Sequence, residues 1–282
     1  MKGNRSRLAH GTRSTAFGLV LCALAGVVGQ YSANAATGSL TDGNSSISLD
    51  LSSSAGMTSW LVNGINQVQQ QWFWFRVGNS GPEADISTIS APVITQTLSK
   101  QLTVAYDLPG QYGVTVRYDL SGGSNPQLSE AITIFNHTAG SLDFHFFQYG
   151  QVTLGNSTAN QNVALTSDLS GITSVGQYGP GGQSYQEAFV NSASRGEAGL
   201  VSDSPNTLAK LTDLNPTTLN DNAAAGSNNP TYAVQWDLSI NAGASKPISI
   251  ITAIPEPSVF ALATLAAIGL FQSKRRKSAK EI

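Results

Sequence analysis

The chain of 282 residues carries only 11% charged side chains, less than half of the about 25% usual for soluble domains, while 40% of its residues are hydrophobic. Residues 36–254 hold six basic and fifteen acidic groups, a net charge of −9, and the other basic groups lie near the two ends. This distribution excludes coiled coils and charge-rich helical proteins, and it predicts no nucleic-acid partner, because phosphate binding needs a stripe of Lys and Arg.

The N-terminus has the pattern of a secretory signal peptide over residues 1–35. Basic residues up to Arg13 precede an apolar run over residues 16–28, and the small residues Ala33 and Ala35 stand before Ala36. We therefore expect signal peptidase to cleave before Ala36. The alternative, a permanent membrane anchor, is disfavoured because thirteen apolar residues are too few for a hydrocarbon core of about 30 Å.

Removal of this segment would leave the exported protein without a thiol. The only cysteine, Cys22, lies inside the apolar run. Disulfides, Cys-ligated zinc and a cysteine nucleophile are then excluded from the exported domain.

Residues 36–254 show alternation of apolar and polar residues in place of helical periodicity. Asn63-Gly64 separates two apolar runs and predicts a hairpin, because both residues tolerate positive φ. Further strands are expected at these segments: 47–51, 57–62, 65–68, 102–108, 112–120, 131–135, 142–149, 231–240 and 248–254. A short helix is expected over 206–214 and an exposed loop over 215–230. The pattern predicts an all-β fold, a single antiparallel sandwich of jelly-roll or Greek-key type.

The run Trp72-Phe73-Trp74-Phe75-Arg76 is open to two interpretations. Flat aromatic rings on a surface could bind sugars, whereas a strand buried on both faces would place all four rings in a core. We favour the core. Replacing either tryptophan with alanine should then destabilise the domain by about 3–5 kcal/mol.

No sequence motif specifies a reaction, and we predict that the protein is not an enzyme. His137 and His145 could act as bases, but two histidines eight residues apart do not specify zinc. The glycines from 176 to 182 lack the strand-to-helix context of a phosphate loop. An exported glycosidase or lyase with two carboxylates stays open, because their separation is a tertiary property.

No cofactor is predicted, although oxygen ligands for Ca²⁺ occur at two places. Asp42-Gly43-Asn44 and Asn220-Asp221-Asn222 could supply them. Neither has the spacing of an EF-hand, and Asp/Asn clusters usually form turns.

The C-terminal segment 255–282 has three parts in a fixed order. Pro255, Glu256 and Pro257 precede an apolar stretch, residues 258–271, that would span about 21 Å as a helix. The basic cluster Lys274, Arg275, Arg276 and Lys277 follows and should remain cytoplasmic. A plain C-terminal membrane anchor is the alternative interpretation.

This segment resembles the PEP-CTERM sorting signal of exported proteins of Gram-negative bacteria. The resemblance implies recognition and cutting near the triplet by an exosortase, a membrane-embedded cysteine transpeptidase-like enzyme. It also implies export through the inner membrane, transient anchoring, and release to the cell surface or extracellular matrix. Some bearers of this tail are labelled ice-binding proteins, a label that describes those bearers and not the tail.

The middle of the chain resembles an uncharacterised family of exported PEP-CTERM proteins. The residues that carry the resemblance are residues 71–78 with 81–83, residues 146–149, and Gln235-Trp236-Asp237. No activity comes with it. We therefore expect a surface or matrix protein of unspecified activity, and the alternatives are a carbohydrate-binding or adhesive module with a polysaccharide partner, or an exported glycosidase or lyase.

Overall fold

The computed structural model describes residues 36–255, and the predicted signal peptide and nearly all of the sorting segment lie outside this range. No helix among the described residues is long and apolar enough to cross a membrane. The predicted membrane helix, residues 258–271, belongs to the part that is not described. Of the sorting triplet only Pro255 is described, two residues after the last strand ends.

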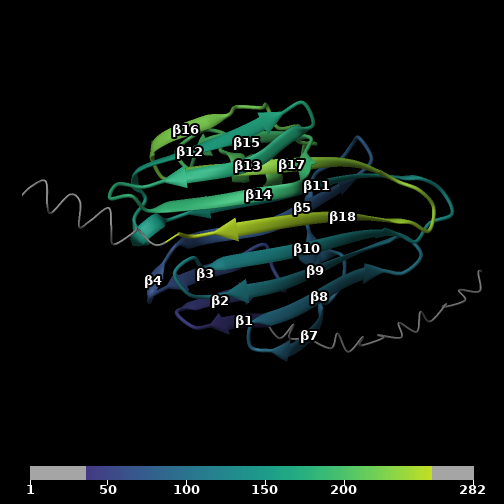
Figure 1. The fold of residues 1–282 in the computed structure, drawn as a ribbon. Helices are drawn as coiled ribbons and strands as arrows, with labels where there is room; N and C mark the ends of the chain where they lie inside the picture. Colours follow the sequence, from purple (N-terminus) through teal and green to yellow (C-terminus); the bar gives the residue numbers. More distant parts are fainter. Residues whose placement is uncertain (1–35, 256–282) are drawn as a thin grey trace, which may run out of the picture. The chain divides into compact units, whose positions relative to one another are not determined.

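The described chain folds into two nine-stranded sheets, A and B, that face each other (Figure 1). The strands of sheet A are β1 (Thr37–Asp42), β2 (Ser45–Asp50), β3 (Gly56–Val62), β4 (Ile65–Asn66), β5 (Val68–Val77), β6 (Ala84–Asp85), β11 (Leu142–Val152), β15 (Arg195–Leu200) and β17 (Pro230–Ile240). The strands of sheet B are β7 (Val93–Leu98), β8 (Gln101–Leu108), β9 (Tyr112–Ser121), β10 (Gln127–Asn136), β12 (Ala159–Asp168), β13 (Gly171–Tyr178), β14 (Ser184–Ala193), β16 (Ala224–Asn228) and β18 (Ser245–Ala253). The 3-10 turns η1 (Ile86–Thr88) and η2 (Leu154–Asn156) and the helix α1 (Thr207–Thr212) complete the elements.

The prediction of an all-β antiparallel sandwich is confirmed. The main path of sheet A runs β1-β2-β3-β5-β11-β17-β15, and sheet B runs β16-β12-β13-β14-β18-β10-β9-β8-β7. Every strand pairing among the described residues is antiparallel except a short parallel contact between β3 and β5. The order is neither sequential nor a simple meander, because β11 and β17 pair in the middle of sheet A while the strands between them in sequence belong mostly to sheet B.

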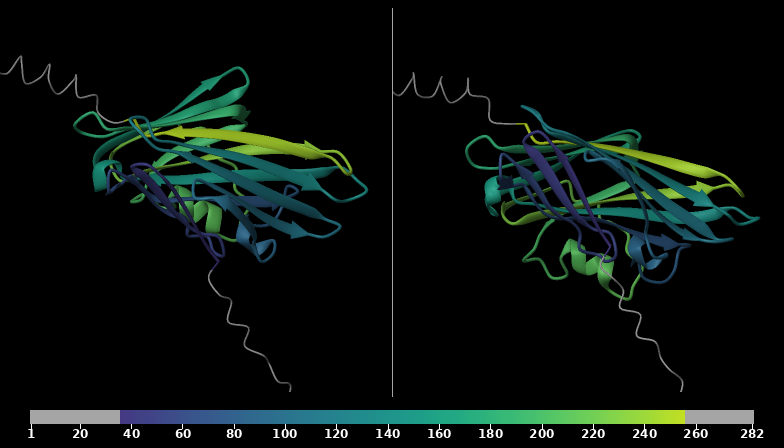
Figure 2. Two further views of the ribbon diagram at one scale, coloured as in Figure 1. Left: turned by 60° about the horizontal axis from the view of Figure 1, so that its bottom comes forward. Right: turned by 90° about the horizontal axis from the view of Figure 1, so that it is seen from below.

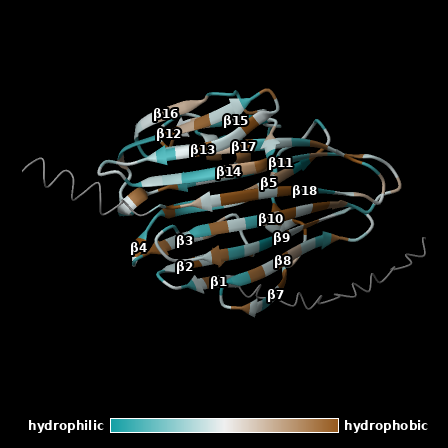
Figure 3. Cartoon of the chain, in the orientation of Figure 1, coloured by the Kyte–Doolittle hydropathy of each residue, from teal (hydrophilic) through white to brown (hydrophobic). Residues whose placement is uncertain are grey.

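The core between the sheets is built from aromatic side chains of sheet A that meet sheet B. Phe75 packs on Tyr112 of β9 at 5.5 Å between ring centroids, and Trp236 packs edge-on against Phe189 of β14 at 5.4 Å. Figure 3 shows the polar and apolar segments that alternate along the strands of sheet B. This alternation buries one face of sheet B and leaves its other face exposed.

Sheet A is covered on both faces, and the core interpretation of the aromatic run is confirmed. Trp72 and Trp74 are 0% and 2% exposed on the face away from sheet B, which we call the outer face of sheet A. Phe73 and Phe75 are 0% and 6% exposed on the inner face. The outer face is covered by the segment between β5 and β7 and by the segment between β15 and β16, which includes α1 (Figure 2).

Two local predictions have opposite outcomes. The expected helix is present as α1, capped by Asn206, whose Oδ1 accepts a hydrogen bond from the Ala209 amide at 2.8 Å. The expected exposed loop over 215–230 is wrong in part, because Thr217 and Leu219 are buried and β16 pairs with β12. Those two residues are buried because their segment lies on the outer face of sheet A.

Candidate functional site

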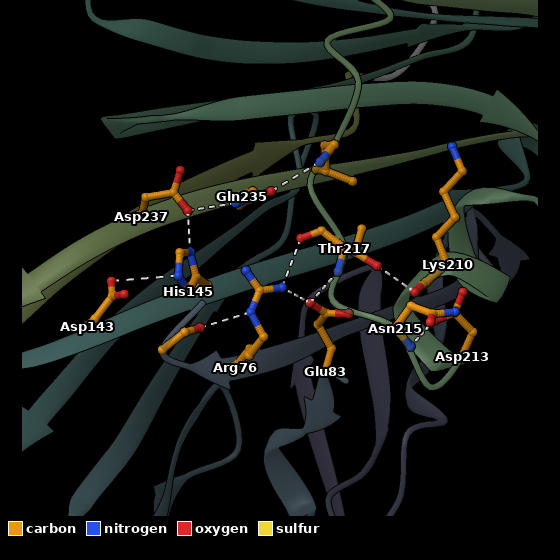
Figure 4. A network of polar contacts seen from close by, with 12 residues as sticks. Arg76, Glu83, Asp143, His145, Lys210, Asp213, Asn215, Thr217, Gln235 and Asp237 are labelled. Atoms are coloured by element: carbon orange, nitrogen blue, oxygen red, sulfur yellow. Dashed lines mark hydrogen bonds and ion pairs between the residues drawn. The ribbon is translucent and has the colours of Figure 1, made fainter. Parts of the chain in front are cut away.

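The outer face of sheet A carries a row of polar residues on three neighbouring strands. In register, Arg76 of β5 lies beside His145 of β11, and His145 lies beside Asp237 of β17. Gln235 is two residues before Asp237 and therefore on the same face. We call Arg76, Asp143, His145, Gln235 and Asp237 the His145 cluster (Figure 4).

His145 is held in one tautomer by Asp237. Its Nδ1 is 2.6 Å from Asp237 Oδ1, and since a carboxylate only accepts, Nδ1 carries the hydrogen. The Nε2 atom of neutral His145 then has a free lone pair. It lies 3.6 Å from Asp143 Oδ1 and has no hydrogen-bond partner among the described residues. An imidazole oriented by a carboxylate, with its second nitrogen unused, can accept a proton from a bound molecule.

The two carboxylates beside His145 reach solvent. The side chains of Asp143 and Asp237 are 48% and 38% exposed, whereas the His145 side chain is 9% exposed. The imidazole is thus withdrawn from bulk water and its Nε2 atom is buried, while the two carboxylates beside it are partly exposed.

The opposite end of the cluster is closed by a buried ion pair. Arg76 binds Glu83 through Nη1, and their side chains are 5% and 0% exposed. Arg76 Nη1 also donates to the Thr217 carbonyl at 2.9 Å, and the Thr217 amide donates to Glu83 Oε1 at 2.9 Å. The ion pair therefore fastens the segment after α1 onto the sheet.

A second chain of hydrogen bonds joins the segment after α1, residues 213–223, to His145. We call these residues the covering segment. The Leu219 amide donates to Gln235 Oε1 at 3.2 Å, and Gln235 Nε2 donates to Asp237 Oδ1 at 2.6 Å. Asp237 thus accepts from both Gln235 and His145. The position of the imidazole depends on residues 217–219, which are about 70 residues away from it in sequence.

A hollow lies beside Arg76 but does not include His145. It has a volume of about 510 Å³, and its lining includes Arg76, Pro82, Thr88, Ile89 and Tyr112. The hollow opens at the edge of the sandwich near β6. Arg76 contributes to both the hollow and the cluster.

The core contains two further carboxylates, Glu130 and Glu187, each 1% exposed. Burial, with a smaller contribution from Glu187, raises the pKa of Glu130 to about 8, and burial also raises the pKa of Glu187. Gln71 donates to both oxygens of Glu130 at 3.2 Å, and Gln148 donates to Glu187 Oε1 at 2.7 Å. A substrate cannot reach these groups, so they are not the carboxylate pair of a glycosidase.

The other predicted candidates lie apart from the cluster. His137, in the turn after β10, lies 2.8 Å from Asp107 through Nε2 and stacks on Phe135. Asp42 accepts from the Gly122 amide, and Asp221 pairs with Arg195. No group of three or more His, Cys, Asp or Glu side chains that could hold a metal ion occurs among residues 36–255. The absence of a cofactor stays a prediction, with Ca²⁺ as its alternative.

Most of the residues that carry the family resemblance lie on three strands, β5, β11 and β17, which are consecutive in sheet A. Residues 71–78 and 235–237 contribute to the His145 cluster, whereas residues 146–149 lie beside it on β11. Sequence reasoning named His145 as a possible base but not its partner Asp237, and it missed the pairing of Arg76 with Glu83. The available signal was a charged or polar residue within each otherwise apolar strand.

No protein-family model matches the chain, and no curated protein matches it in sequence. Solved structures do share its fold. A bacterial glucoamylase complexed with acarbose matches with a TM-score of 0.56 and 12% identity, over 82% of this chain and 34% of the glucoamylase chain. This chain thus spans about a third of the glucoamylase.

Two smaller proteins match over nearly their whole length. The Slr1438 protein of Synechocystis has a TM-score of 0.54 and 10% identity, over 79% of this chain and 97% of that one. A galactose mutarotase-like protein from Lactobacillus casei has a TM-score of 0.51 and 10% identity, over 78% and 100%. At these identities the matches establish a shared fold.

The prediction that the protein is not an enzyme is overturned by these matches. The chain shares its fold with a galactose mutarotase-like protein, so a lack of sequence motifs is no argument against an enzyme. The prediction rested on the absence of sequence motifs. In this fold the polar groups come from strands far apart in sequence, so no local motif marks them.

Proposed function

We propose that residues 36–255 form a carbohydrate-active domain in which His145 exchanges a proton with a bound sugar. The observation that carries the proposal is the His145 imidazole, fixed by Asp237 at 2.6 Å and unpartnered at Nε2. The fold shared with a galactose mutarotase-like protein and a glucoamylase supports carbohydrate as the substrate class.

The chemistry that suits this arrangement is proton transfer at the anomeric centre. Opening an aldose ring needs a base that removes the proton of the anomeric hydroxyl and an acid that protonates the ring oxygen. Neutral His145 can accept the first proton at Nε2, and Asp237 stabilises the imidazolium that results. The protonated imidazole then donates this proton to the ring oxygen as the ring opens, and the reverse transfer closes the ring on either face of the carbonyl.

The test is the rate at which pure α-anomers of glucose and galactose reach equilibrium, followed by ¹H NMR. The native protein should accelerate at least one of them, and His145→Gln should lower the acceleration by about 10²–10⁴-fold. His137→Gln is the matched control, because His137 also contacts a carboxylate but lies in an exposed turn. If the protein neither accelerates the anomerisation of either sugar nor binds either sugar, the proposal is contradicted.

Carbohydrate binding without catalysis is the second candidate, and the covering segment favours it. Thr217 and Leu219 occupy sheet surface next to Gln235, so the exposed groups beside His145 are the carboxylates of Asp143 and Asp237. Sugar binding that is lost in His145→Gln, with no change in anomerisation rate, would select this candidate.

We also propose that the domain is exported and sorted by its C-terminal segment. The last strand ends at Ala253, so Pro255, Glu256 and Pro257 follow the domain directly, and an extended proline-flanked junction suits the cleft of a processing enzyme. In a host that encodes the exosortase, Glu256→Ala should accumulate an untrimmed, membrane-held precursor. Unchanged trimming and location would instead favour a plain anchor.

A further inference from the structure

The exposed face of sheet B contains a row of mostly small, uncharged residues that crosses many strands. Successive pairings place one member of the row on each strand from β12 to β9: Thr166, Ser174, Ala188, Ile251, Ser129 and Asp119. A second row, two residues along each strand, runs parallel to it: Ala164, Gly176, Gln186, Ala253, Gln127 and Ser121. Both rows lie on the face away from sheet A.

The surface along these rows is hollowed at two places that meet at Ile251. One hollow, of about 300 Å³, lies over β12, β13, β14 and β18. The other, of about 430 Å³, lies over β18, β10, β9 and the start of β8. We call the two hollows together the sheet B trough. It crosses seven strands from β12 to β8, which at about 4.8 Å between strands gives a length of about 29 Å.

The trough is hollow because its floor lacks large side chains. Ala164, Gly176, Ala188 and Ala253 form the floor of the first hollow. Gly176 has a particular role there, since a Cβ at this position would stand 3.0 Å from Tyr178 Oη and 3.1 Å from its Cε2. The Tyr178 ring therefore leans over the glycine along the sheet, and the side chain stays 51% exposed.

The groups around the trough match an uncharged sugar chain. Gln186, Thr166 and Ser174 offer amide and hydroxyl groups, and Tyr178 offers an exposed ring on which the C–H face of a sugar can stack. Charges occur only at the far end, where Asp119 pairs with Arg117 at 2.9 Å and lies near Lys100.

Other occupants fit this surface less well. An anionic polymer needs a row of basic side chains, and the trough holds a single lysine at one end. A protein partner needs a larger apolar area than the three exposed apolar side chains of the trough provide: Tyr178, Ile251 and Leu98, with exposed fractions of 51%, 40% and 53%.

We propose that the sheet B trough binds the chain of a neutral polysaccharide, as a site separate from the His145 cluster. Tyr178 and Gln186 are the principal contacts. The length of the trough suits several consecutive sugar units. The two sites lie on opposite outer faces of the sandwich, so one variant can remove either without the other.

The test is affinity electrophoresis of the exported protein, produced from the full chain, in native gels. The gels contain soluble starch, barley β-glucan or galactomannan as neutral polymers, and alginate as the anionic polymer. We expect retardation in at least one neutral gel. Tyr178→Ala and Gln186→Ala should each weaken that retardation by about tenfold in apparent dissociation constant, a change of a size that single contacts give.

Three further variants make the result specific. Gly176→Val keeps the tyrosine but fills the floor and displaces its ring, so it should weaken retardation like Tyr178→Ala. Phe135→Ala removes another exposed aromatic side chain of sheet B outside the trough and should leave retardation unchanged. His145→Gln should also leave it unchanged, whatever its effect on anomerisation.

Several results would contradict the proposal that the sheet B trough binds a neutral polysaccharide. They are equal migration in all neutral gels and polymer-free gels, retardation by alginate alone, and retardation that survives both Tyr178→Ala and Gln186→Ala. Loss of retardation in His145→Gln alone would assign the binding to the other face. A failed anomerisation assay with intact, Tyr178-dependent retardation would leave the trough standing and contradict only the catalytic proposal.

Discussion

The outer faces of the two sheets differ although the strands beneath them have similar geometry. On sheet A the outer face is covered, and Trp72, Trp74 and Phe147 are buried there around Arg76 and His145. On sheet B the outer face is open and carries Thr, Ser, Ala and Gln side chains. A polar residue on the covered face is costly unless it is paired, so Arg76 and His145 have specific partners. On the open face polar residues are hydrated and need no protein partner. A binding site there is therefore identified by the shape of the surface.

The largest expected difference between the faces concerns aromatic residues. Trp74→Ala should lower the free energy of unfolding by about 3–5 kcal/mol, because the indole is buried on the outer face of sheet A. Tyr178→Ala should change it by no more than about 0.5 kcal/mol. Urea unfolding followed by circular dichroism measures both. Small and equal effects would mean that the outer face of sheet A is open to solvent.

One buried and one exposed ion pair extend the comparison between covered and open surface. Glu83→Ala should cost about 3–5 kcal/mol, because it leaves the Arg76 guanidinium buried without its carboxylate. Arg195→Ala breaks the pair with Asp221, whose partners are 43% and 49% exposed, and should cost no more than about 1 kcal/mol. Thermal or urea unfolding of the two variants checks this, and a Glu83→Ala protein as stable as Arg195→Ala would contradict the burial of Arg76.

Truncating a buried side chain of the covering segment should weaken its packing on sheet A. Leu219 is 1% exposed, so Leu219→Ala should destabilise the protein by about 2–5 kcal/mol. It should also speed hydrogen exchange at the Thr217 and Leu219 amides, which bind Glu83 and Gln235. Leu214→Ala, in the same segment but 87% exposed, is the control. Unchanged exchange in Leu219→Ala would mean that the leucine does not hold the segment.

The sequence predicted the sandwich but not the polar cluster. Alternation along residues 112–120 identifies a strand because one face of sheet B is open. The run from Trp72 to Phe75 does not alternate, since sheet A is covered on both faces, yet its aromatic content still indicated a core strand. The strands β12, β13 and β14 were missed, because their exposed faces are rich in Ser, Gln and Asn and resemble loops. The strand β15 was missed because its sequence, RGEAGL, is short and contains two glycines.

The pairing of Arg76 with Glu83, and that of His145 with Asp237, lay beyond sequence reasoning. The first pair depends on β6 and on the covering segment, and the second joins strands 92 residues apart. What the sequence does offer is a polar residue within each apolar strand, in FWFRV, DFHFF and VQWDL. Only the strand order brings the three together.

The pH dependence of stability distinguishes the core carboxylates from those on the surface, and here the expected effect is smaller. The pKa of Glu130 is raised from 4.5 to about 8, mainly by burial and then by Glu187, so the folded protein holds this proton after the unfolded chain has lost it. Stability should therefore fall as the pH rises from about 4.5 to about 8, by about 1 kcal/mol per pH unit for one group.

Glu130→Gln should flatten this dependence and stabilise the protein near pH 8. Asp168→Asn, at a fully exposed carboxylate, is the control and should leave the slope between pH 5 and 8 unchanged. Urea unfolding at a series of pH values measures the slopes. An equal slope in native protein and Glu130→Gln would mean that Glu130 is ionised in the folded state.

The central claim is that His145 Nε2 meets a sugar while Nδ1 stays bound to Asp237. Long-range ¹H–¹⁵N NMR of the imidazoles reports the two nitrogens separately, and His137→Gln leaves His145 as the only histidine of residues 36–255. Titration with galactose or glucose should shift the Nε2 resonance of His145 and leave Nδ1 in its hydrogen-bonded position. An Nε2 resonance that does not move with either sugar at saturating concentration would contradict the account.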